Sequence, residues 1–140
     1  MKERYYGGNM SVTSFLHLSN PGGGEFDTEM FCGEMARKYP GTDTEQSQSK
    51  SLAYDITWSR YADGPQFEVR LDRTRRTLAV EYFYSADRIR DYANFILWIR
   101  RYFPSEQEVV LVDENNEAPM PLSPEAAPAD IEAWILRTGV

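Results

Sequence analysis

Cysteine and histidine are almost absent from this chain of 140 residues, which has one of each, Cys32 and His17. A single cysteine excludes an intramolecular disulfide bond and any metal site made only of cysteines. A chain without disulfides fits a reducing compartment, so we expect a cytoplasmic protein. A nucleophile or metal site would need a base, an orienting partner or further ligands near these residues, and no motif supplies them. We therefore predict no catalytic residue, no metal and no cofactor.

Long apolar runs are also missing. No stretch of 18 apolar residues occurs, so we expect no helix that spans a membrane. The first nine residues begin with charges and have no apolar stretch behind them, unlike a signal peptide. We expect residues 1–10 to be a flexible extension and residues 11–140 to be a single domain.

Basic residues are outnumbered: 15 lysines and arginines stand against 22 acids, for a net charge of −7. A chain that binds nucleic acid must neutralise several phosphates at once, so this balance argues against that class. Opposite charges attract over long distances, so the same balance favours a basic protein partner.

The clearest pattern present is alternation of apolar and polar residues in three segments, 52–59, 67–72 and 78–84. Turns at residues 63–65 and 73–76 separate them, which predicts an antiparallel three-strand meander. Counting outward from the turns sets Trp58 opposite Val69 and Ile56 opposite Leu71. The same count sets Val69 opposite Val80 and Leu71 opposite Leu78. Apolar residues thus face apolar ones throughout, and a slip of one residue would move them to the wrong side.

A long helix is predicted at residues 86–102, directly after the third strand. Ser85 can cap its first turn, and Pro104 ends it. Its apolar residues recur at helical spacing and form one stripe: Ile89, Tyr92, Ala93, Ile96, Ile99 and Phe103. A second helix is predicted from Asp27, as its cap, to about Tyr39, followed by an exposed polar loop at residues 41–50.

Two further strands are predicted at residues 11–18 and 109–112, and a short final helix contains Ile131, Trp134 and Ile135. Together these elements predict an α+β fold with a single, mainly antiparallel sheet and helices packed on one face. If the first strand lies beside the last, the sheet resembles a ferredoxin-like arrangement with an extra strand.

The predicted register aligns acids on the outer face of the meander. One row contains Ser59, Glu68 and Glu81, and another contains Asp55, Asp72 and Thr77, with Arg70 between the rows. Directly opposed like charges destabilise a sheet, so Glu68 opposite Glu81 needs a cation nearby. The acids can be interpreted as a catalytic carboxylate pair, as an acidic binding patch, or as an ordinary solvated face.

A second aromatic face on the long helix consists of Phe95, Trp98 and Tyr102. Its residues are three and four positions apart and lie away from the core stripe. Either the final helix covers them, or they join two copies of the chain in a homodimer.

Our functional hypothesis is a small acidic module that binds a basic protein, as inhibitors and immunity-type proteins do. Affinity would need an aromatic residue that loses water on binding. The predicted partner-binding residues are Asp55, Glu68, Asp72, Glu81, Phe83, Tyr61 and Trp98. The alternatives are a small-molecule-binding or enzymatic domain that uses the open sheet face, and a homodimeric structural module.

Overall fold

The computed structural model of the chain describes residues 12–20, 22–115 and 118–140, so the predicted extension at residues 1–10 lies outside the described residues. The described residues form one sheet of seven strands and three helices, which confirms the predicted α+β class. In chain order the elements are β1 (Ser14–Leu18), α1 (Thr28–Lys38), β2 (Asp43–Gln46), β3 (Tyr54–Arg60), β4 (Gln66–Asp72), β5 (Thr77–Tyr84), α2 (Arg88–Arg100), β6 (Val109–Asp113), β7 (Met120–Pro121) and α3 (Pro128–Thr138).

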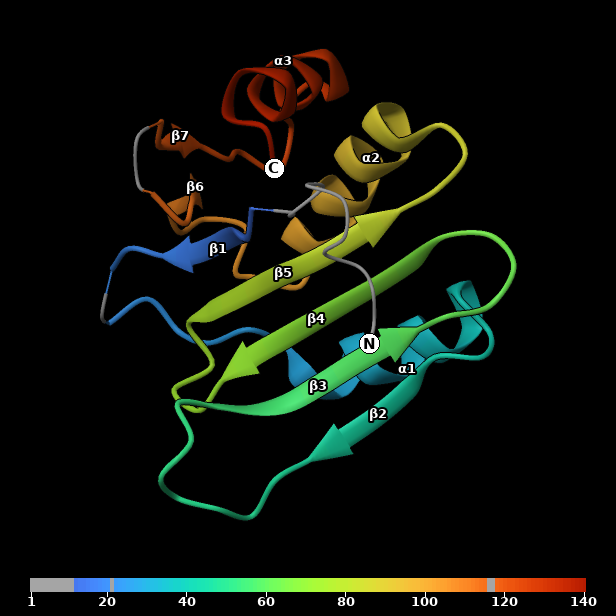
Figure 1. The fold of residues 1–140 in the computed structure, drawn as a ribbon. Helices are drawn as coiled ribbons and strands as arrows, with labels where there is room; N and C mark the ends of the chain where they lie inside the picture. Colours follow the sequence, from blue (N-terminus) through green and yellow to red (C-terminus); the bar gives the residue numbers. More distant parts are fainter. Residues whose placement is uncertain (1–11, 21, 116–117) are drawn as a thin grey trace.

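The strands follow the order β2-β3-β4-β5-β1-β6-β7, and every neighbouring pair is antiparallel (Figure 1). The first strand, β1, lies between β5 and β6. The ferredoxin-like variant is not confirmed by this order, because α1 leads from β1 to β2 at the far edge of a seven-stranded sheet.

The predicted register of the meander is confirmed at all four apolar pairs: Trp58–Val69, Ile56–Leu71, Val69–Val80 and Leu71–Leu78. These residues are buried, and they face the helices. Burial of a large apolar side chain stabilises the fold by about 1.5–3 kcal/mol. This gain is lost if the strands slip by one residue, so it holds the register in place.

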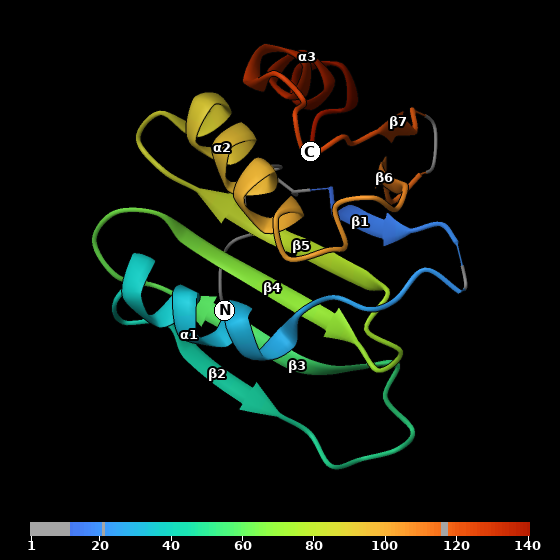
Figure 2. The same ribbon diagram turned by 180° about the vertical axis from the view of Figure 1, so that it is seen from behind.

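The helices α1 and α2 cross the same face of the sheet, and α3 lies beside α2 (Figure 2). The predicted Asp27 cap of α1 is confirmed, since its carboxylate accepts from the Met30 N–H at 3.2 Å. The Ser85 cap is wrong: α2 begins two residues later, with Asp87 in the cap position. Ser85 instead donates from its hydroxyl to the Asp91 carboxylate at 2.8 Å. No described helix is long and apolar enough to cross a membrane.

The second aromatic face is covered within the chain, but by α1 rather than by the final helix. Rings of α1 and its C-cap pack against it: Phe31 lies 5.2 Å from Trp98, and Tyr39 lies 5.7 Å from Phe95. Phe95, Trp98 and Tyr102 are all buried, so they do not form an exposed surface for a homodimer. The final helix, α3, packs against α2 and is tied to the β6–β7 connection by the Trp134 indole, which donates to the Ala118 carbonyl at 2.5 Å.

The predicted polar loop at residues 41–50 contains a strand that the sequence analysis missed. The four residues of β2 are all exposed and pair with β3 at the edge of the sheet. They have no apolar side chains, and therefore lack the alternation that identifies a half-buried strand.

Candidate binding surfaces

The face of the sheet opposite α1 and α2 carries two rows of polar residues across β2, β3 and β4. One row is Asp43, Ser59 and Glu68, and the other is Glu45, Thr57 and Arg70. No described helix lies on this open face, which is turned toward the viewer in Figure 1. The structure thus adds Asp43 and Glu45 to the acids that the sequence analysis placed here.

A β-bulge in β5 separates the two acids that the sequence analysis set opposite each other. Glu68 pairs with Tyr82, and the next pair is Val69 with Val80, so Glu81 is the extra residue. The Arg70 guanidinium lies 3.2 Å from the Glu81 carboxylate. The expected opposition of Glu68 and Glu81 is therefore wrong, although the expected nearby cation, Arg70, is present.

The same bulge changes the side on which two aromatic residues lie. Because one residue is inserted, Phe83 turns into the core, where it is 2% exposed and stacks on Tyr92 at 4.9 Å. Tyr82 turns to the open face and stacks on Tyr61, with ring centroids 6.1 Å apart. Phe83 was predicted to bind a partner, but its side chain is buried and offers no surface for one.

Tyr61 is the one predicted aromatic partner-binding residue that the structure places at the surface. Its side chain is 57% exposed, and its hydroxyl donates to the Glu68 carboxylate at 2.6 Å. Trp98 is 7% exposed and lies under α1, and it therefore offers no comparable surface. Tyr61, Tyr82 and Glu68 together form a cluster at the end of the first polar row, which we call the tyrosine cluster.

Asp55 lies in a second β-bulge, in β3, and is buried rather than exposed. Its two carboxylate oxygens accept from the Arg75 guanidinium at 2.5 and 3.2 Å, and Arg73 lies 3.9 Å away. The hydrogen bonds from Arg75 are the main cause that lowers the pKa of Asp55. Asp55 borders the open-face groove described below, but it is not an exposed acid, because it is buried and its charge is balanced by Arg75.

Asp72 organises the turn between β4 and β5. One carboxylate oxygen accepts from the backbone N–H groups of Arg76 and Thr77, both at 2.8 Å, and the other accepts from Thr74. Arg75 has a φ of 64° in this turn, a backbone conformation that residues other than glycine rarely adopt. These hydrogen bonds engage the Asp72 carboxylate and stabilise the turn. In the sheet, Asp72 lies opposite Tyr54 and not opposite Asp55, as the sequence had predicted.

A groove of about 840 Å³ runs along the open face beside β2. The ionisable carboxyl and guanidinium groups that line it are four acids, Asp43, Glu45, Asp55 and Glu68, and one base, Arg70. Asp55 is paired with Arg75, and three acids therefore remain against one arginine. The groove carries net negative charge.

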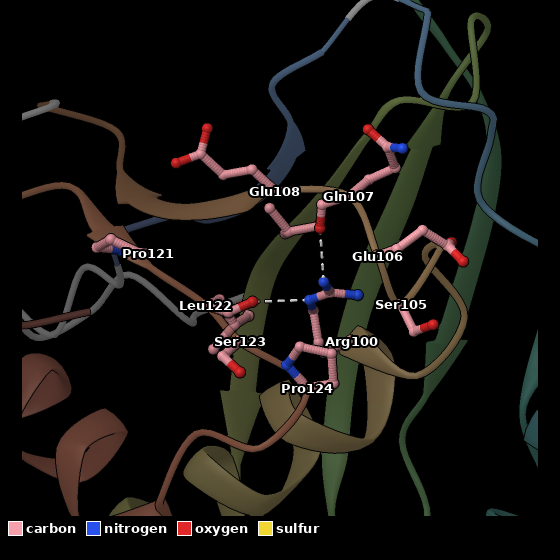
Figure 3. Close-up of a pocket in the computed structure, with 10 residues that line it drawn as sticks. Arg100, Ser105, Glu106, Gln107, Glu108, Pro121, Leu122, Ser123 and Pro124 are labelled. Carbon is pink, nitrogen blue, oxygen red and sulfur yellow. Dashed lines mark hydrogen bonds between the residues drawn. The ribbon is translucent and has the colours of Figure 1, made fainter.

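A second, smaller pocket of about 340 Å³ lies at the end of α2, where β6 begins and β7 ends (Figure 3). Arg100 forms part of its wall and is 1% exposed. No sequence pattern marks Arg100 as part of a pocket, because its guanidinium donates to backbone carbonyls, one of them, Leu122, 22 residues along the chain. The remaining lining residues are Ser105, Glu106, Gln107, Glu108, Val109, Pro121, Leu122, Ser123 and Pro124.

His17 and Cys32 lie on different elements and differ in exposure. His17 is exposed on β1, and its Nδ1 lies 2.7 Å from the Thr77 hydroxyl. Cys32 is half-buried on α1, and burial raises the pKa of its thiol. Over residues 12–20, 22–115 and 118–140, no three side chains of histidine, cysteine, aspartate or glutamate gather in a way that could hold a metal ion. The predicted lack of a catalytic residue, metal or cofactor stays a prediction.

No family model matches the chain, and the searches of curated proteins and solved structures found no match either.

Proposed function

We propose that the chain is a small acidic module that binds a basic surface of another protein through the open face of its sheet. The observation that carries this proposal is the row that runs from Asp43 on β2 to Glu68 on β4 and ends at the tyrosine cluster. It combines negative charge along a groove with an exposed aromatic residue at one end. More specifically, we propose that binding neutralises the basic partner, as an inhibitor or immunity-type protein does.

The two parts of this surface would act at different stages of binding. Acids along the groove attract a basic protein before contact and raise the association rate, and salt screens this attraction over about 8–10 Å. Affinity after contact depends on side chains that lose water on binding, for which tyrosine is suited because its ring is large and rigid. Tyr61 has these properties, and its ring is held in place by Tyr82 and Glu68.

The experiment is to capture partners from the source cell on the immobilised chain, purify a captured protein and measure its association kinetics across a salt series. We expect a basic partner whose association rate falls steeply as salt increases. Reversal of two groove charges, in the double variant Asp43→Lys/Glu45→Lys, should lower the association rate at low salt by about tenfold or more.

The matched control reverses two exposed acids on the other side of the molecule, Glu25→Lys/Glu29→Lys. It changes the net charge by the same amount, so a larger effect of the groove variant locates the binding surface. Equal effects of the two variants, or an acidic partner, would contradict the proposal. A metabolite that raises the melting temperature with no protein captured would favour the small-molecule alternative.

A further inference from the structure

Arg100 is a buried cation with no carboxylate partner among the described residues. It is the largest charged side chain in the core, and no described carboxylate lies within 4 Å of its guanidinium. Leaving a charge in a low-dielectric interior without an opposite charge costs several kcal/mol. Burial accordingly lowers the pKa of Arg100, and only the more distant charge of Glu125 acts in the other direction.

Four backbone carbonyls surround the guanidinium, and Figure 3 shows two of them, those of Leu122 and Gln107. Nε donates to Leu122 at 2.7 Å and Nη2 donates to Gln107 at 2.9 Å. Nη1 donates to Pro104 at 3.2 Å and, more weakly, to Phe103 at 3.5 Å. A guanidinium has five N–H groups, so one N–H, on Nη2, is left over. The carbonyls satisfy hydrogen bonds, but because they are neutral they do not balance the charge.

The pocket beside Arg100 has room for a small organic ligand. Its volume of about 340 Å³ lies at the lower end of the range of ligand sites. Val109, Leu122, Pro121 and Pro124 give it an apolar lining next to the guanidinium. Two acids also line it, but the side chains of Glu106 and Glu108 extend away from Arg100 in Figure 3.

We propose that this pocket binds a small monocarboxylate with an apolar body. The ligand carboxylate accepts a hydrogen bond from the remaining Nη2–H and supplies the missing counter-charge. The apolar part of the ligand lies against the apolar lining of the pocket. A charge-assisted hydrogen bond in a partly dry site is stronger than one between neutral groups. This inference does not depend on the proposed protein partner, since the pocket lies away from the β2–β4 groove.

The test compares benzoate with benzamide, which has nearly the same shape and no charge. Binding to the wild-type chain is measured by titration calorimetry, and the Arg100 Nε–H signal is followed by NMR. We expect benzoate to bind at least tenfold more tightly than benzamide and to shift the Arg100 signal. Equal affinities, no binding of benzoate, or shifts confined to other residues would overturn the proposal.

Replacing Arg100 risks unfolding the chain, because its hydrogen bonds tie α2 to the segment before β6 and to the residue that follows β7. A second variant, Ser105→Trp, therefore fills the rim of the pocket; Ser105 is exposed, and no hydrogen bond of its side chain is described. We expect Ser105→Trp to lower benzoate affinity at least tenfold and to leave the melting temperature unchanged. The control, Gln48→Trp, places the same side chain at an exposed position outside the pocket and should leave the affinity unchanged. Full benzoate affinity in Ser105→Trp would place any binding elsewhere and overturn the proposal.

Discussion

The two faces of the β3–β4–β5 meander are made from the same strands, yet their residues pair with different regularity. On the face toward α1 and α2, Val69, Leu71, Leu78 and Val80 are fully buried and meet in the register that the turns predict. On the open face, two bulges shift the partners of Asp55 and Glu81. The faces differ because a mispaired apolar row loses its burial, whereas a shifted polar row still contacts water.

The bulges allow the same strands to keep apolar pairs on the helix-facing side and polar residues on the open side. An extra residue in β5 lets Phe83 join the core while Tyr82 reaches the open face, and it removes the opposition of Glu68 and Glu81. A bulge of this kind re-aims the side chains that follow it. The helix-facing side thus keeps regular apolar pairs, and the open side gains a tyrosine cluster.

The largest expected effect follows from placing a charge on the helix-facing side. Val80→Asp should destabilise the fold by about 4 kcal/mol or more, because it buries an unpaired carboxylate. The control Thr57→Asp puts the same charge on the open face beside Arg70 and should change the stability by about 0.5 kcal/mol or less. Urea unfolding measures both, and a fully stable Val80→Asp protein would contradict the meander.

A smaller effect is expected at the bulge in β3. Asp55→Asn removes the negative charge that faces Arg75 and should cost about 2 kcal/mol at neutral pH. Because the pKa of Asp55 is lowered by folding, its contribution is present above the pKa of the unfolded state, about 3.9, and is lost as the pH falls through the lower folded-state value. The wild type should therefore lose stability on acidification below about pH 4 more steeply than Asp55→Asn.

Urea unfolding at neutral pH and at about pH 3 tests this expectation. The difference between the two proteins should shrink at the lower pH. A difference that does not change with pH would show that the Asp55–Arg75 pair contributes through packing and not through charge.

The smallest expected effect comes from deleting Glu81, the extra residue of β5. Without it, Val80 and Phe83 still face the core and Tyr82 still faces outward, so we expect a folded protein. The loss of the half-exposed pair with Arg70 should cost about 1 kcal/mol or less. Deleting Arg70 from β4 is the matched control: it moves every later residue of that strand to the opposite face and should prevent folding. Circular dichroism and urea unfolding distinguish the two, and unfolding of the Glu81 deletion would show that the bulge itself is required.

Most of the fold could be predicted, whereas the candidate surfaces could be predicted only in part. Alternation and turn residues were sufficient for the meander, helical spacing was sufficient for α2, and the Asp27 cap indicated α1. Of the predicted partner-binding residues, Glu68, Glu81 and Tyr61 lie on the open face, where their role in binding stays a prediction. Asp43 and Glu45 were missed because β2 has no apolar side chain to show alternation.

The sequence by itself determined which residues of the meander pair inside the core, since apolar burial has only one favourable register there. Only the tertiary structure decided which polar residues stay available to a partner or ligand. Asp55 is occupied by Arg75, which follows it by 20 residues, and Arg100 is held by the carbonyl of Leu122, which follows it by 22. Neither contact can be predicted from a local sequence pattern. A hydrogen bond to a distant guanidinium or to a backbone carbonyl does not require residues of one kind at regular spacing between the two groups.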